Sequence, residues 1–207
     1  MKTLSYEPKS GAGRALCRQD EVLGALIRQV GEIQLVLDDD YFPALAESIV
    51  SQQLSLKAAQ TIWNRMRLVC GTVSPEAILN TDMEKMRLAG LSAGKIVYLK
   101  DLSQKILDGE IKLPEFLQMP DVDIARKLAK VKGVGPWTVQ MFLIFSLGRE
   151  DVFSPKDAGL CRAVRWLYDN DTMTEEEIHA LSKRWAPYRT CASLYLWEAI
   201  NRGLVNS

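Results

Sequence analysis

Two glycines and a later carboxylate are the residues of this chain whose types and spacing suggest chemistry. Gly133 and Gly135 flank Val134 in the run KGVGPW, and paired glycines allow a turn that is too tight for side chains. Backbone N–H groups in such a turn can face outward and bind a phosphate oxygen without a charged side chain. Asp157 follows in the run SPKDAG, where a carboxylate would stand at the start of a helix. The pattern therefore indicates an anion-binding corner followed by one acidic group.

The segments that would position these residues are almost all helical. Apolar residues recur at helical spacing, and no pair of alternating segments predicts a convincing β-hairpin. Asp20 and Ser74 are expected N-caps, and Thr174 with Glu177 forms a capping-box pattern. The expected helices cover residues 20–30, 41–52, 55–68, 75–80, 82–88, 92–107, 122–130, 136–147, 157–168, 174–184 and 188–201. We therefore predict an all-α protein of about ten helices.

The overall charge of the chain gives no argument for a partner. The 26 basic and 26 acidic residues cancel, whereas many nucleic-acid-binding domains are strongly basic. Acidic runs at 38–40 and 175–177 leave Lys156, Arg162 and Arg165 in the sequence around Asp157. A phosphate-binding surface is compatible with this distribution, although charge runs are usually only solvated faces.

The composition is that of an ordinary globular protein. Hydrophobic residues make up 47% of the chain and the mean hydropathy is -0.07. No apolar run approaches the length of a membrane span, and the first residues lack the apolar centre of a signal peptide. We expect a cytoplasmic protein with no membrane partner.

The cysteines do not form a metal-binding pattern. They are widely separated, with no CxxC pair, and His179 is the single histidine. The four are Cys17, Cys70, Cys161 and Cys191. We expect reduced thiols that mostly pack between helices, and neither a zinc site nor an iron–sulfur cluster.

A resemblance to a known family connects the glycine turn with the carboxylate. The stretch 128–164 resembles the helix-hairpin-helix motif, Gly/Pro-rich loop and aspartate of the DNA base-excision glycosylase superfamily. The likeness is closest to the monofunctional 3-methyladenine DNA glycosylase II type, because Trp137 and the run WAPYR at 185–189 also fit. The run SIVSQQLSLKAA at 48–59 is similar to the junction between two helices with which this family probes DNA.

The resemblance implies a two-lobed helical fold with the active-site cleft between the lobes. Lobe one would cover about residues 35–150, including the hairpin at 128–140. Lobe two would combine residues 1–34 with residues 151–207. The family branch that it indicates has no iron–sulfur cluster.

Asp157 is then the expected catalytic residue. The simpler explanation of an aspartate at this position is a helix cap, which is worth about 1 kcal/mol, and one carboxylate can do both. Cleavage of an N-glycosidic bond builds positive charge on the sugar, and a fixed negative charge in a water-poor site stabilises that transition state. Asp157 can also orient or deprotonate the attacking water. The sequence leaves open which effect dominates.

Trp137 and Met141 are the expected base-pocket residues. A purine alkylated at N3 or N7 is cationic, and a cation over an indole gains roughly 0.5 to 2 kcal/mol. The alternative is an ordinary core aromatic at helical spacing. Trp137 also stands where lyase-competent members of the superfamily have the lysine that forms a Schiff base, and an indole cannot form one. Further aromatics that can line the pocket are Tyr41, Phe42, Trp185, Tyr188 and Trp197.

The hairpin is expected to hold the DNA backbone. The N–H groups of Gly133, Gly135 and Thr138 would bind a phosphate 3′ of the lesion, at the start of a helix with proline in its first position. A simple helix–helix turn also favours glycine. The resemblance further implies a structural Na+ or K+ held by the backbone carbonyls of Ala129, Val131 and Gly133, with no side-chain metal ligand and no other cofactor.

Gln53 and Leu54 are the expected wedge residues. They lie in a polar joint between two predicted helices, and in the family a side chain from this joint fills the hole left by the extruded nucleotide. Gln53 matches that position, with Leu54 as its neighbour. A solvated turn is the alternative, because inserted wedges are more often apolar than amide.

These residues together predict a monofunctional DNA glycosylase of base excision repair. It would act as a monomer on damaged double-stranded DNA, in the nucleoid of a bacterium or the nucleus of a eukaryote. It would remove 3-methyladenine and 7-methylguanine and leave an abasic site. Two alternatives stay open: a glycosylase for another damaged or deaminated base, with or without lyase activity, and a non-catalytic helix-hairpin-helix module.

Overall fold

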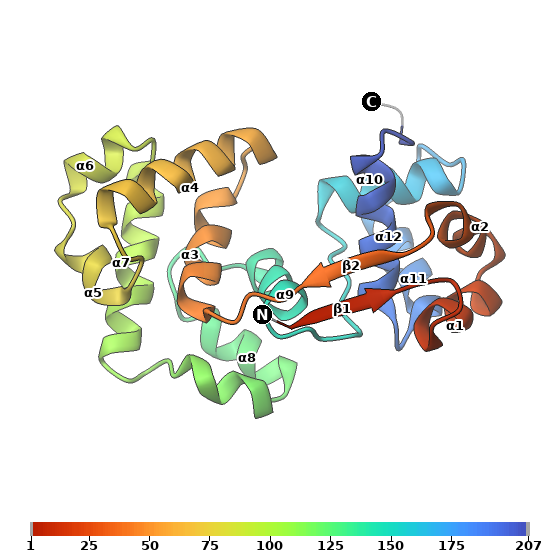
Figure 1. Cartoon of the computed structure of the whole chain (residues 1–207), viewed down its shortest axis with the longest axis horizontal. Coiled ribbons are helices and arrows are strands. Elements are labelled where there is room, and N and C mark those ends of the chain that lie inside the picture. The colour runs from red at the N-terminus through yellow and green to blue at the C-terminus, as the bar shows by residue number, and fades with distance from the viewer. Residues whose placement is uncertain (1, 206–207) are drawn as a thin grey trace. The chain divides into compact units, whose positions relative to one another are not determined.

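The computed structural model of the chain describes residues 2–205, which form two compact units (Figure 1). Unit 1 consists of Met1–Leu37 and Gly148–Ser207, and unit 2 of Asp38–Leu147. Helices dominate both units, so the prediction of a helical fold is confirmed. No helix among residues 2–205 is long and apolar enough to cross a lipid bilayer.

Unit 1 contains a small sheet that the sequence did not predict. Strand β1 (Thr3–Tyr6) pairs antiparallel with β2 (Ile33–Val36), with Thr3 opposite Val36 and Tyr6 opposite Ile33 (Figure 1). Each strand has four residues, too few for a clear alternating pattern. Two helices separate them in sequence, so no turn marks the pairing.

The helices of unit 1 pack around the last helix of the chain. They are α1 (Gly11–Gln19), α2 (Glu21–Val30), α10 (Ala158–Leu167), α11 (Glu175–Ser182), the 3-10 helix η2 (Lys183–Trp185) and α12 (Arg189–Asn201). Helix α12 contacts α2 and α10, and its Tyr195 and Leu196 are fully buried. Thr174 and Glu177 form the expected capping box at the start of α11.

A buried aspartate joins three elements of unit 1. Asp20 caps α2 by accepting the Leu23 N–H at 3.1 Å, as predicted, and also accepts bonds from the Tyr168 hydroxyl and from Trp185 Nε1 at 3.1 Å. Burial raises the pKa of Asp20, but these hydrogen bonds outweigh it and hold the pKa below its ordinary value. Trp185 is fully buried and packs edge-on against Phe153, so it belongs to the core and not to a base pocket.

Unit 2 is a single uninterrupted stretch of the chain, and it contains several helices. Its helices are α3 (Tyr41–Ser51), α4 (Leu56–Cys70), α5 (Pro75–Asn80), α6 (Met83–Leu88), α7 (Ala93–Leu107), η1 (Leu113–Gln118), α8 (Asp121–Leu128) and α9 (Pro136–Phe145). Helix α3 lies against α7 and α9, and Phe142 of α9 makes edge-on ring contacts with Tyr41 and Phe116. Ser74 caps α5 with Pro75 at its first position, as predicted.

Helix α1 was not predicted, because its sequence contains two glycines. Each glycine in a helix costs about 1 kcal/mol relative to alanine. Gly13 is nevertheless needed, since a Cβ there would lie 2.0 Å from the carbonyl oxygen of Glu7. Close packing of the backbone therefore overrides helix propensity at this position.

The four cysteines are free thiols. Cys161 and Cys191 are buried in α10 and α12, and Cys17 and Cys70 are half-buried. Burial raises the pKa of Cys191 to about 12, which keeps it a neutral, unreactive thiol. Over the described part of the chain, no three His, Cys, Asp or Glu side chains group closely enough to hold a metal ion.

Candidate functional site

The two glycines of the hairpin between α8 and α9 have different roles. Gly133 has φ +73°, and a Cβ there would lie 2.1 Å from the ring of Tyr98. Gly135 has φ -100°, and nothing lies within 4 Å of the place of its Cβ. The turn is therefore too tight for a side chain at Gly133 alone. The space beside Gly135 is open to a ligand.

Replacing Gly133 by alanine should destabilise the protein, whereas the same change at Gly135 should not. Left-handed backbone strain and the clash with Tyr98 together predict a loss of about 2 to 5 kcal/mol in the free energy of unfolding. Gly135→Ala keeps an allowed conformation and should leave stability unchanged or slightly raised. Urea unfolding of the two variants checks this. Equal stability of both variants would contradict the packing of Tyr98 under the turn.

The backbone N–H groups of the hairpin are available for a ligand. Over residues 2–205, no hydrogen bond engages the N–H groups of Gly133, Gly135 or Thr138. Gly135 is the N-cap of α9 but has no side chain to cap it, and Pro136 in the first position has no N–H group. The start of α9 thus presents unsatisfied donors and the positive end of a helix dipole, which suits a phosphate.

The predicted base-pocket residues lie on one face of α9. Trp137 and Met141 are four residues apart, so their side chains neighbour each other on the helix. Trp137 is half-buried and Met141 is 8% exposed. Between them, Thr138 is 1% exposed, and its hydroxyl accepts a hydrogen bond from Gln52 at 2.9 Å.

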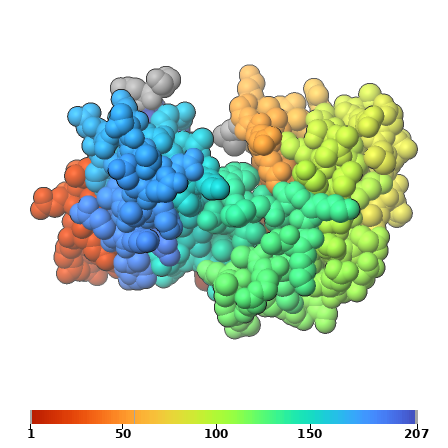
Figure 2. Space-filling model, turned by 180° about the vertical axis from the view of Figure 1, so that it is seen from behind, coloured from red at the N-terminus to blue at the C-terminus, as the bar shows by residue number. Residues whose placement is uncertain are grey.

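The predicted wedge residues lie in a strained joint between α3 and α4. Gln53 has φ +56°, which residues other than glycine rarely adopt. Its side chain is exposed, and Leu54 is 37% exposed. The segment that contains this joint, orange in the space-filling view, projects from the surface of unit 2 (Figure 2). An amide and an apolar side chain are thus both exposed at this joint.

Gln52, a polar residue of the joint to which the sequence analysis assigned no role, connects this joint to the hairpin. Its Nε2 donates to the Gly133 carbonyl and to the Thr138 hydroxyl, both at 2.9 Å. Residues 52 and 133 are far apart in sequence, and only the packing of α3 against α9 brings them together. No local signal could have predicted the contact.

Two of the three carbonyls expected to hold a monovalent cation already accept a hydrogen bond. The Val131 carbonyl accepts the Val134 N–H at 3.2 Å, and the Gly133 carbonyl accepts Gln52 Nε2. A carbonyl oxygen has two lone pairs, so each can still contribute one to a cation. Ala129 is the C-cap of α8, where unpaired carbonyls are expected. The donor set therefore fits Na+ or K+.

Asp157 of unit 1 is the N-cap of α10, and its position is fixed from two sides. Its Oδ1 accepts the Leu160 N–H at 2.8 Å and the indole Nε1 of Trp197 at 3.2 Å. Asp157 is half-buried, and Ser154, three residues earlier in the chain, is fully buried. A Cβ on Gly159 would lie 3.2 Å from Oδ1, so glycine leaves the carboxylate its place. The capping prediction is confirmed, and the carboxylate is also held by a second donor.

Trp197, one of the further aromatics considered for a base pocket, contacts the candidate catalytic residue. It orients Asp157 through an indole hydrogen bond across the contact between α10 and α12. Of the basic residues around Asp157, Arg165 donates its Nε to the Met173 carbonyl at 2.8 Å, while Lys156 and Arg162 are exposed.

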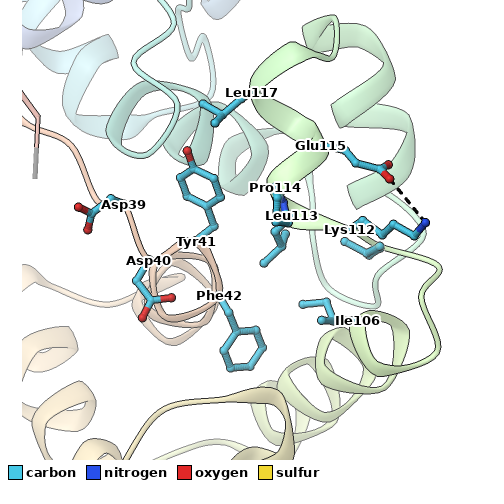
Figure 3. Close-up of a pocket in the computed structure, with 11 residues that line it drawn as sticks. Asp39, Asp40, Tyr41, Phe42, Ile106, Lys112, Leu113, Pro114, Glu115 and Leu117 are labelled. Carbon is cyan, nitrogen blue, oxygen red and sulfur yellow. Dashed lines mark ion pairs between the residues drawn. The ribbon is translucent and has the colours of Figure 1, made fainter.

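A hollow of about 810 Å³ lies on unit 2 beside the start of α3 (Figure 3). Tyr41 and Phe42, two of the aromatics that we considered for a base pocket, line it together with Leu113 and Leu117. Asp39 and Asp40 add negative charge at its edge. Neither Trp137 nor Met141 lines this hollow, so it is separate from the predicted base-pocket residues.

The chain is similar in sequence to known DNA repair proteins. Residues 46–187 match the model of the HhH-GPD superfamily base excision DNA repair proteins. A putative DNA-3-methyladenine glycosylase of Bacillus subtilis is 36% identical over 86% of this chain, and the chain spans 65% of that relative's length.

Two solved structures are similar to this chain over almost its whole length. The crystal structure of a DNA-3-methyladenine glycosidase from Bacillus halodurans superposes with a TM-score of 0.84 at 36% identity, covering 97% of this chain and 94% of that one. The Schizosaccharomyces pombe 3-methyladenine DNA glycosylase in complex with abasic DNA superposes with a TM-score of 0.86 at 32% identity, covering 93% of this chain and 97% of that one.

The match over residues 46–187 places the chain in a family of base excision DNA repair proteins. The chain belongs to the HhH-GPD superfamily.

Proposed function

We propose that the chain is a monofunctional DNA glycosylase that removes alkylated purines, chiefly 3-methyladenine and 7-methylguanine, and leaves an abasic site. The observation that carries this proposal is Asp157, a half-buried carboxylate held by both a helix N-terminus and an indole N–H. A residue that served only to cap α10 would not need the second donor from Trp197. The named activities of the relatives support the same reaction.

The fixed carboxylate suits the charge that develops in this reaction. As the base departs, positive charge grows on the sugar, and a negative group that needs no reorientation stabilises it. The bonds from Leu160 and Trp197 hold Oδ1 in place before substrate binds. Asp157 also orients or deprotonates the water that attacks the sugar.

Unit 2 supplies the proposed contacts to double-stranded DNA. The N–H groups of Gly133, Gly135 and Thr138 hold one phosphate, and the exposed Gln53 and Leu54 enter the duplex beside the extruded nucleotide. Neither the backbone N–H groups nor these two side chains are charged, so the proposed contacts do not require an excess of basic residues, and the chain has none. A monovalent cation on the hairpin carbonyls would add positive potential at the same phosphate. The protein acts as a monomer.

Trp137 offers the cationic base an indole face, with Met141 beside it on α9. Selection by electron deficiency favours several alkylated purines over a single one, because it does not depend on one hydrogen-bond pattern. The test is to incubate the protein with methylated duplex DNA and identify the free bases released. Release of 3-methyladenine and 7-methylguanine is expected. Release of only uracil or an oxidised purine would assign another base specificity, and binding without release would indicate a non-catalytic module.

Borohydride should not trap a covalent adduct between the protein and DNA that contains the lesion. A Schiff base requires an amine, and Trp137 occupies the position where lyase-competent members have a lysine. Intact abasic strands should accumulate until alkali is added. Efficient trapping would place the protein in the bifunctional branch. Lys132, which lies 4.0 Å from Asp101, and the exposed Lys156 would then be replaced in turn.

A further inference from the structure

One face of α7 contacts both of the loops that we assign to DNA. Lys95, Tyr98 and Asp101 follow each other at three-residue spacing, so their side chains lie along one side of the helix. Lys95 binds the α3–α4 joint, Tyr98 lies under Gly133, and Asp101 accepts the Lys132 N–H at 2.9 Å. The wedge joint and the phosphate hairpin are therefore both anchored on the same helix.

Lys95 is the residue of α7 that binds the α3–α4 joint. Its Nζ donates to the Val50 carbonyl at 2.7 Å and to the Gln52 carbonyl at 2.8 Å. These carbonyls lie at the end of α3, where the last acceptors of a helix lack partners and where a cation is favourable. Burial lowers the pKa of Lys95, so the protein gives up some solvation of this charge to keep it here.

The residue that follows these carbonyls is the strained Gln53. A non-glycine residue keeps a left-handed conformation only when its surroundings determine it more strongly than its own preference does. Besides its backbone N–H bond to the Ile49 carbonyl, three hydrogen bonds hold Gln52, the residue before it. The Gln52 carbonyl accepts from Lys95, and the Gln52 side chain donates to Gly133 and Thr138. Removing the Lys95 bonds would free the backbone at the entry to the wedge.

We propose that Lys95 is a positioning residue for nucleotide extrusion: it holds the α3–α4 joint so that Gln53 and Leu54 are preset to enter the duplex. This inference rests on the proposed glycosylase function. Lys95 acts on the opening of the base pair and leaves the chemistry at Asp157 unaffected. Its loss should therefore matter most where opening is most costly, in a fully paired duplex.

The test compares Lys95→Met with wild type on two substrates. One is a duplex with 7-methylguanine paired to cytosine, and the other carries the same lesion in a single-nucleotide bulge. Lys95→Met should lose about tenfold in the single-turnover excision rate on the paired duplex, because fewer molecules hold the competent joint. It should stay within about twofold of wild type on the bulge, where extrusion costs least. Equal losses on both substrates, or no loss on either, would overturn the proposal.

Lys100→Met is the matched control. Lys100 lies on the same helix and donates to one backbone carbonyl, that of Leu79 at 3.3 Å, so the substitution makes the same chemical change away from the joint. It should leave the ratio of the two rates as in wild type. Lys95→Arg, which keeps the charge and the donors, should recover most of the lost rate.

Two further measurements keep the result decisive. If Lys95→Met unfolds, Gln52→Met removes the side-chain bonds to Gly133 and Thr138 and should give the same difference between paired and bulged substrates. Fluorescence of a 2-aminopurine beside the lesion reports extrusion without excision. A wild type that opens the duplex but releases no base would reject the glycosylase function. The inference about Lys95 would then be decided by the fluorescence alone, and unchanged fluorescence in Lys95→Met would reject it.

Discussion

Replacement of Asp157 by asparagine should nearly abolish base release while leaving the fold and DNA binding intact. Asparagine caps a helix as well as aspartate does, and its amide oxygen can still accept from Leu160 and Trp197. It carries no charge and cannot take a proton from water. We expect the excision rate to fall by a factor of about 10² to 10⁴.

The matched control for this change is Asp82→Asn. Asp82 is also an N-cap, accepting the N–H groups of Glu84 and Lys85 at 2.8 and 3.2 Å, but it belongs to α6 of unit 2. Both variants should unfold at the same urea concentration as wild type. The Asp157 variant should bind abasic DNA as tightly as wild type or more tightly, because a negative charge near phosphates is removed. Wild-type excision by Asp157→Asn would remove Asp157 from the mechanism.

Gly135→Asp should weaken DNA binding by about tenfold or more, because like charges brought together at an interface cost several kcal/mol. The backbone at Gly135 has an ordinary φ, and the space beside it is open, so aspartate fits without strain. Its carboxylate would occupy the place where the phosphate approaches. Damaged and undamaged duplexes should lose affinity alike, since a phosphate contact carries no sequence or lesion information.

Gly11→Asp is the control for added charge. Gly11 also has nothing within 4 Å of the place of its Cβ, and it opens α1, where a carboxylate is favourable. Fluorescence anisotropy at several salt concentrations measures both variants. Wild type should show a shallower salt dependence than a strongly basic domain, because few side-chain cations displace counterions. Unchanged affinity in Gly135→Asp would mean that the hairpin is only a structural turn.

Local sequence signals predicted the helices better than they predicted the connections. Caps such as Asp20, Ser74 and Thr174 act within one helical turn, so they can be recognised from adjacent residues. The β1–β2 pairing depends on residues separated by two helices, and α1 tolerates glycine because of its neighbours. Neither the strand pairing nor helix α1 can be recognised from a short window of sequence.

The same division applies to the candidate site. The glycines of the hairpin and the cap at Asp157 were visible because each belongs to a local motif. The second donor to Asp157, the indole of Trp197, comes from a helix 40 residues later. Lys95 could not be recognised from its neighbours in sequence, because a lysine on a helix is usually a solvated charge. Family resemblance proposes the groups that react, and the tertiary structure is needed to find the groups that hold them.

The division of the chain into units has a consequence for how such a protein can change. Unit 2 is one uninterrupted segment, whereas unit 1 is built from both ends of the chain. The two ends of the unit 2 segment meet, because the Asp38 N–H donates to the Phe145 carbonyl at 2.9 Å. A segment with adjoining ends behaves as an insertion in its host. Its loops can lengthen, shorten or change sequence while the chain still enters and leaves unit 1 at the same two points. The unit that we propose to contact DNA can therefore diversify while the hydrogen bonds that hold Asp157 inside unit 1 stay the same.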